Sequence, residues 1–130
     1  MRSMLLVLAV LAAGAHADEG TPCDNVETTQ QAFECSAYNK TTSEHELDNS
    51  YKDMVERISA QNTNHPAQLA DYLGKIKNAQ EIWKKLRDAD CAVQTFANEK
   101  GSQAFQVAEN DCIAQMSDER SEYLQSIGIE

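Results

Sequence analysis

The residues whose chemistry is easiest to infer from type and spacing are four cysteines, Cys23, Cys35, Cys91 and Cys112. Cysteines in a small exported chain usually form disulfides, whereas zinc and redox sites need closer spacing such as C-x-x-C or several histidines. No C-x-x-C pair occurs, and only two histidines, His45 and His65, follow the first 17 residues. The cysteines therefore predict two disulfides, with three possible pairings, and argue against a zinc or thioredoxin-like site.

Carboxylates are the most abundant chemical groups, because 21 Asp and Glu residues outnumber 11 Lys and Arg residues and give a formal net charge of −10. With so many acidic residues, carboxylate pairs arise by chance, and no glycine-rich phosphate loop or nucleophile motif accompanies them. We therefore predict a protein that is not an enzyme and that needs no cofactor or metal. The acidic balance argues against nucleic acid or an anionic membrane as partner and favours a basic protein, although solubility alone would also explain it.

The only tryptophan, Trp83, lies in a stretch from Ala79 to Cys91 that has the apolar periodicity of an amphipathic helix. Gln80 and Arg87 lie close to its apolar seam, where polar groups need partners. Trp83 and Arg87 allow two interpretations. They form a structural polar core between helices, or they are partly exposed and anchor a partner, as Trp and Arg often do. The spacing favours the core.

The first 17 residues have the pattern of a secretory signal peptide. Arg2 supplies the positive charge, residues 4–13 are apolar, and Ala15-His16-Ala17 forms a cleavage motif. No cysteine stands at the cleavage site, and no later stretch is apolar enough to span a membrane. The sequence thus predicts one domain, residues 18–130, that is periplasmic or secreted and has no membrane anchor. Loss of Arg2 would take its net charge to −11, because residues 1–17 contain no acidic residue.

Three helices account for the domain, and the predicted fold is an all-α antiparallel three-helix domain stapled by two disulfides. The first helix starts after Thr28 in a capping box and runs to about residue 60; residues 39–43 are weak helix formers and leave a kink or break open. The second runs from Pro66 to about residue 98, and the third starts after Gly101 and Ser102. The apolar positions of the second helix include Leu86 and Val93, and those of the third helix include Tyr123.

The pairing of the cysteines depends on how the first two helices are aligned. If they form an antiparallel hairpin that turns near residue 63, residues at equal distances from the turn lie level with each other. Cys35 and Cys91 are then level. This register selects a disulfide between Cys35 and Cys91 and leaves Cys23 to pair with Cys112, which the irregular lead-in is long enough to reach.

The same register predicts an ion pair between the first two helices. Glu44 is level with Ile82 and lies within one turn of Trp83 and Arg87. Both charges would face apolar seams, where neither is tolerated alone. We therefore predict a buried Glu44–Arg87 pair, with Asp90 as an alternative partner for the arginine.

Several motifs together resemble a known family. Cys23 and Cys35 flank the start of the first helix, and Leu47-x-x-x-Tyr51 follows. The chain then has Gln80-x-x-Trp83-x-x-x-Arg87-Asp88-x-x-Cys91, Gly101-Ser102, Cys112 and Arg120-x-x-x-Leu124. This combination resembles the LprI-type lysozyme inhibitor domain. The resemblance covers nearly all of residues 18–130 and implies a small, exported, disulfide-linked, all-helical domain of bacteria.

The resemblance implies that the partner is a protein, namely a basic lysozyme or related cell-wall hydrolase, which this acidic domain would bind and block. Two alternatives remain open: a structural or assembly factor of the envelope, and an immunity-type protein that neutralises another hydrolase. If Trp83 and Arg87 belong to the core, the binding surface should be acidic. The candidate residues are Glu44, Glu46, Asp48, Asp53 and Glu56 on the first helix and Asp111, Asp118, Glu119 and Glu122 on the third.

Overall fold

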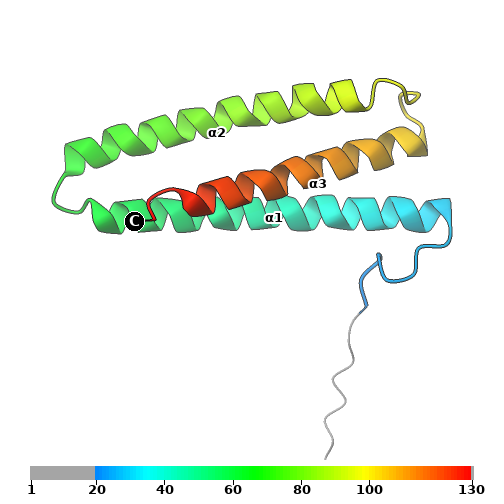
Figure 1. Cartoon of the computed structure of the whole chain (residues 1–130), viewed down its shortest axis with the longest axis horizontal. Helices are drawn as coiled ribbons and strands as arrows, with labels where there is room; N and C mark the ends of the chain where they lie inside the picture. The colour runs from blue at the N-terminus through cyan, green and yellow to red at the C-terminus, as the bar shows by residue number, and fades with distance from the viewer. Residues whose placement is uncertain (1–19, 130) are drawn as a thin grey trace, which may run out of the picture.

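The computed structural model describes residues 20–129, so the predicted signal peptide lies outside the described residues. Three helices follow one another: α1 (Thr29–Gln61), α2 (Pro66–Gln94) and α3 (Gln103–Ser126) (Figure 1). Within this range there is no β-strand, and the predicted all-α fold of three helices with two disulfides is confirmed. None of the three helices is long and apolar enough to cross a membrane.

Local sequence signals set the helix starts. The Thr28 hydroxyl accepts a hydrogen bond from the Gln31 amide at 3.1 Å, and the Gln31 side chain accepts one from the Thr28 amide at 3.0 Å. This is the predicted capping box. Pro66 occupies the first turn of α2, and the Ser102 side chain caps α3. Gly101 precedes that cap with a φ of 80°, the left-handed conformation in which glycine carries no steric cost.

The structure settles one open point and changes one boundary. α1 continues without a break through residues 39–43, because the weak helix formers there lie in a 33-residue helix supported along its length by packing. α2 ends at Gln94 instead of about residue 98. Thr95 stops it, since its hydroxyl donates to the Cys91 carbonyl at 2.8 Å within a buried turn.

The first two helices do not form the closely packed hairpin that the sequence predicts. α1 and α3 run parallel and pack most closely, with α2 antiparallel to both and lying mainly against α3 (Figure 1). Hydrogen bonds from Gln103 to Gln30, from Asn110 to Ser36 and from Gln125 to Ser50 mark the parallel register along the whole interface. The prediction that α1 and α2 pack directly along their length is therefore wrong. They meet through large side chains, while the α1 and α3 backbones approach each other closely.

Small side chains explain this close approach. Ser36, Ser43 and Ser50 are buried and lie seven residues apart on α1, so they form a stripe along one face. Opposite them, Ala114, Ser117 and Ser121 are buried on α3. Ridges this shallow let two helices pack with little separation. We call these six residues the small-residue seam.

Arg57 follows Ser50 at the same interval of seven and ends the seam. Its guanidinium donates to the Leu124 carbonyl at 3.1 Å and to the Ile127 carbonyl at 2.7 and 3.0 Å. These carbonyls lie at the C-terminal end of α3, where helix acceptors lack intrahelical partners and a positive charge is favourable. Arg57 thus fixes the end of α3 onto α1.

The seam contains two hydroxyls, those of Ser117 and Ser121, that are buried without a hydrogen-bond partner. An unsatisfied buried polar group costs about 1 kcal/mol or more, and alanine is also the better helix former. We therefore expect Ser117→Ala to raise the free energy of unfolding by about 1 kcal/mol. Urea denaturation followed by circular dichroism measures this. A loss of stability would show that the hydroxyl has a partner, such as an ordered water.

The apolar core is centred on Met54 and Ile58 of α1 and Leu124 of α3, none of which is more than 1% exposed. Ile76 of α2 completes it, and Trp83 packs against it while remaining partly exposed. Several residues predicted to be in the core are instead exposed, including Leu86 (52%), Val93 (75%) and Tyr123 (53%). On α2 the core-facing positions begin with Leu69, Leu73 and Ile76 as predicted, and they continue through Gln80, Trp83 and Cys91, which leaves Leu86 and Val93 outside.

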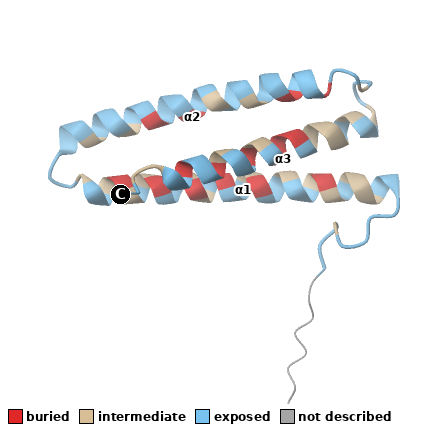
Figure 2. Ribbon diagram, viewed as in Figure 1, coloured by how far each residue is buried: buried red, intermediate tan, exposed pale blue. Residues whose placement is uncertain are grey.

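Most of the outer side of α2 is exposed (Figure 2). Ile82, Leu86, Val93 and Phe96 are all more than half exposed and recur at helical spacing into the turn that follows the helix. We call these four residues the α2 apolar stripe.

The disulfide pairing predicted from the hairpin register is wrong. Cys23 is bonded to Cys35 and Cys91 to Cys112, with Cα–Cα distances of 4.7 and 5.6 Å. One assumption failed: Cys91 faces α3 instead of α1, where it meets Cys112. The first disulfide ties the lead-in to α1, and the second ties α2 to α3.

The observed pairing predicts a specific pattern of tryptic peptides from the oxidised protein. No Lys or Arg separates Cys23 from Cys35, so both lie in the peptide that ends at Lys40. Lys100 separates Cys91 from Cys112, so these should appear as two peptides joined by a disulfide. Mass spectrometry without reduction should find one internal bridge and one cross-link. A cross-link to the Lys40 peptide would contradict the observed pairing.

Candidate functional site

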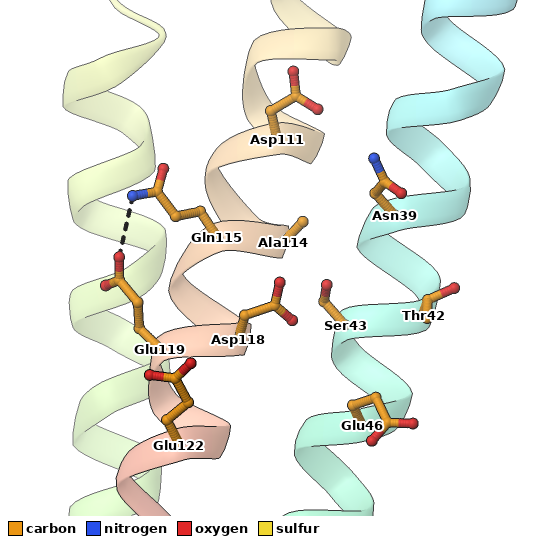
Figure 3. A pocket seen from close by; sticks show the side chains of 10 residues that line it. All are labelled: Asn39, Thr42, Ser43, Glu46, Asp111, Ala114, Gln115, Asp118, Glu119 and Glu122. Carbon is orange, nitrogen blue, oxygen red and sulfur yellow. Dashed lines mark hydrogen bonds between the residues drawn. The ribbon is translucent and has the colours of Figure 1, made fainter. Parts of the chain in front are cut away.

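An acidic groove lies between α1 and α3, with a volume of about 580 Å³. Its lining includes five carboxylates and no Lys, Arg or His. The residues are Asn39, Thr42, Ser43 and Glu46 from α1, and Asp111, Ala114, Gln115, Asp118, Glu119 and Glu122 from α3 (Figure 3). The small-residue seam forms its floor at Ser43 and Ala114. The polar rim is therefore positioned by the same close packing that sets the helix register.

The side chains of the groove fall into two groups. Asp118 points from α3 towards Ser43 on α1, so it lies across the floor of the groove (Figure 3). Gln115 and Glu119 lie on the side of α3 turned away from α1 and are joined by a hydrogen bond of 3.1 Å. One wall is thus held in place by its own contacts, while the Asp118 carboxylate has no hydrogen bond or ion pair within residues 20–129.

The groove also changes the proton affinity of one carboxylate. Partial burial between the two walls removes some of the hydration of Asp111 and raises the pKa of its carboxyl above the ordinary value. The charged form is therefore less favoured there than in water. A cation placed beside Asp111 would stabilise the charged form of its carboxyl again, which makes this end of the groove suited to a basic side chain.

The structure brings together five of the nine acidic residues proposed for partner binding: Glu46, Asp111, Asp118, Glu119 and Glu122. The other four do not line the acidic groove. Glu44 lies in a separate depression with Lys40, and Asp48 lies near Lys77 and Lys84, so lysines offset their charge. Asp53 and Glu56 lie farther along α1.

Trp83 and its polar neighbours form a second cluster, between α2 and α3. The guanidinium carbons of Arg87 and Arg120 lie 5.5 and 5.6 Å from the centre of the Trp83 ring, within cation–π range. Gln80, which is buried, accepts a hydrogen bond from Arg120 Nε at 3.0 Å. The Trp83 ring and the Gln80 amide thus each have a cationic partner.

The contacts of Arg87 differ in part from those predicted. One guanidinium nitrogen lies 3.8 Å from Glu44 and another 3.0 Å from Asp88, whereas Asp90 makes no ion pair with it. The Glu44 side chain is 41% exposed, so this contact is not the buried pair that the sequence suggested. At that exposure an ion pair stabilises a protein by less than about 1 kcal/mol.

The small-residue seam and the contacts of Arg120 were not predicted from the sequence. The seam had a usable signal, because Ser36, Ser43, Ser50 and Arg57 recur at a strict interval of seven. Serine does not contribute to an apolar pattern, so this interval does not appear as a helical stripe. Arg120 entered only as part of a family motif.

The fold and the groove define a small, disulfide-linked helical protein with an acidic groove on its surface. The chain belongs to the family of lysozyme inhibitor LprI, whose model matches residues 23–124. The crystal structure of a DUF1311 family protein from Pseudomonas putida KT2440 is similar, with 47% identity and a TM-score of 0.73; the match covers 82% of this chain and 99% of that one. No curated protein sequence matches the chain. The resemblance noted from the motifs is thereby confirmed.

Proposed function

We propose that this protein is an exported inhibitor of a lysozyme and that it holds the enzyme through the acidic groove. Membership of a family named for lysozyme inhibition supports the activity. The observation that carries the choice of surface is the groove lining, which collects five carboxylates from two helices without a basic residue. Export follows from the signal peptide predicted at residues 1–17.

Electrostatics gives this arrangement a physical basis. C-type lysozymes are generally basic, and a protein with a net charge of −10 attracts them over distances set by the ionic strength. Charge complementarity raises the association rate and orients the partners, while contacts made in the groove slow dissociation. Inhibition then needs no chemistry by this protein, because a helix pair seated beside the substrate cleft obstructs it.

The direct test is a titration of lysozyme activity on cell walls with the oxidised protein. We expect inhibition that saturates near one equivalent in low salt, weakens as salt is raised, and is lost when both disulfides are reduced. Salt acts by screening exposed charges, and reduction acts by loosening a thin fold. Unchanged lysis at a large molar excess in low salt, tested with each lysozyme class, would refute the proposed activity.

The raised pKa of Asp111 predicts how inhibition depends on pH. Protonation removes a negative charge that a basic partner would contact, so affinity should fall as pH is lowered. Because burial raises the pKa of Asp111, this residue loses its charge at a higher pH than a fully hydrated aspartate. Inhibition should therefore weaken as the pH is lowered. The part of this loss that begins at the highest pH comes from protonation of Asp111, so it should be absent in Asp111→Asn. An identical pH profile in the variant would place Asp111 outside the interface.

The α2 apolar stripe favours a second candidate, an envelope assembly or immunity-type protein with an endogenous partner. Ile82, Leu86, Val93 and Phe96 expose large side chains that a soluble monomer has no need to present in a row. A pull-down from periplasmic extract with the native protein and with a Leu86→Ser/Val93→Ser variant distinguishes the two functions. Retention of a lysozyme-class hydrolase by both supports inhibition. Retention of an envelope complex by the native protein alone supports the second candidate.

A further inference from the structure

Arg120 is a guanidinium without a carboxylate partner in a chain that has 21 acidic residues. Its Nε donates to Gln80 Oε1 at 3.0 Å, and its guanidinium carbon lies 4.8 Å from the centre of the Tyr123 ring and 5.6 Å from that of Trp83. Within residues 20–129 no Asp or Glu oxygen lies within 4.0 Å of it, and its two terminal nitrogens make no hydrogen bond. Its orientation is fixed, yet most of its donors are unused.

A pocket of about 250 Å³ lies between α2 and α3, and Arg120 is one of the residues that line it. Its walls are mostly apolar or aromatic, and its two cations are Arg120 and Lys75. Lys75 is already paired with Asp71, one helical turn away, so Arg120 is the cation available to a ligand. The remaining lining residues are Tyr72, Ile76, Ala79, Tyr123, Leu124 and Ile127.

The pocket is separate from the acidic groove. Asp118, in the groove, and Arg120 are two residues apart on α3, which places them about 200° apart around the helix. One side of α3 therefore presents carboxylates, and the opposite side presents a guanidinium between two aromatic rings. A ligand of the second site must carry the opposite charge to a ligand of the first.

We propose that this pocket binds a small apolar carboxylate. The carboxylate would accept hydrogen bonds from the two terminal nitrogens of Arg120, the geometry in which arginine binds carboxylates most strongly. An alkyl group would lie between Tyr72, Ile76 and Ile127, where it removes apolar surface from water. The volume equals that of about eight water molecules in the liquid, which suits a ligand of similar heavy-atom count such as hexanoate.

The strong net negative charge of the protein does not prevent this binding. At physiological ionic strength, charges more than about 8 Å apart in solvent are largely screened, so the nearby guanidinium determines the local potential. Binding should therefore be measured at 0.15 M salt, and it should weaken in very low salt, where the repulsion by distant carboxylates reaches the pocket. This is a different salt dependence from that expected for lysozyme inhibition, which is strongest in low salt.

Trp83, the only tryptophan, lies beside Arg120 and provides an optical probe. We expect hexanoate to change its fluorescence with saturation in the millimolar range or below, and hexanamide and sulfate to bind at least tenfold more weakly. Arg120→Gln should weaken hexanoate binding at least tenfold. Arg87→Gln is the matched control, because that guanidinium lies equally close to the Trp83 ring but does not line the pocket, and it should leave binding unchanged.

A second variant tests the pocket independently in case Arg120→Gln does not fold. Ala79 is an exposed helical residue that lines the pocket, so Ala79→Glu should fold and place a carboxylate within reach of Arg120. It should abolish hexanoate binding, while Ala79→Gln should retain it. Equal binding of hexanamide or sulfate, hexanoate binding by Arg120→Gln, or no saturable response of the native protein would each overturn the proposal.

Discussion

Lysozyme inhibition should weaken about 30- to 150-fold when Asp118 and Glu122 are both replaced by lysine. Each replacement removes an attraction to a basic partner and adds a repulsion, each of about 0.5 to 0.75 kcal/mol for partly exposed charges, so two replacements change the binding free energy by about 2 to 3 kcal/mol. Both side chains line the acidic groove on α3. The inhibition constant in low salt measures the effect, and the difference from the native protein should shrink as salt is raised.

The control for this variant must change the net charge equally and leave the groove intact. Glu81→Lys/Asp90→Lys meets both conditions, because these exposed residues lie on α2 and do not line the groove. We expect it to slow association slightly and to change the inhibition constant less than about threefold. If both double variants lost the same affinity, the inhibition would depend on overall charge and the groove would have no special role.

The fold should lose about 3 kcal/mol of stability, and its melting temperature about 10 °C, when Ser117 is replaced by leucine. Ser117 is fully buried in the small-residue seam between α1 and α3, and leucine adds three carbon atoms there. The helices must separate or the side chain must adopt a strained rotamer. Thermal unfolding followed by circular dichroism provides the measurement.

Ser126→Leu is the matched control, since it makes the same change at an exposed position near the end of α3. Its effect should be about 0.5 kcal/mol or less, as for most surface substitutions. Equal losses for the two variants would attribute the effect to serine replacement in general. A native-like stability for Ser117→Leu would show that α1 and α3 can separate at no cost, which contradicts a close-packed seam.

The sequence predicted those parts of the fold that depend on a few neighbouring residues. Thr28 and Gln31, Pro66 and Ser102 mark helix starts through contacts within one turn, and all of them act as expected. Gly101 has the expected left-handed conformation, but it does not cap α2, which ends earlier at Gln94. The disulfides depended on which helices are neighbours, and that depends on side-chain size. Ser36, Ser43 and Ser50 draw α3 towards α1, so Cys91 meets Cys112 instead of Cys35.

The candidate site shows the same division. Each carboxylate of the groove was named from the sequence, because acidic residues on exposed helix faces are recognisable one at a time. Their grouping was not predicted, since Glu46 joins Asp118 and Glu122 only when α1 and α3 are parallel neighbours. For the same reason the sequence alone could not exclude Asp53 and Glu56, which are equally acidic, from the groove.

The most direct test of the account is a map of the surface that lysozyme covers, by amide hydrogen exchange of this protein alone and with one equivalent of enzyme in low salt. We predict slower exchange along the groove, in residues 39–46 of α1 and 111–122 of α3, and unchanged exchange in residues 82–96. Protection confined to the α2 apolar stripe, or no protection although lysozyme is inhibited, would contradict the account and move the interface away from the acidic groove.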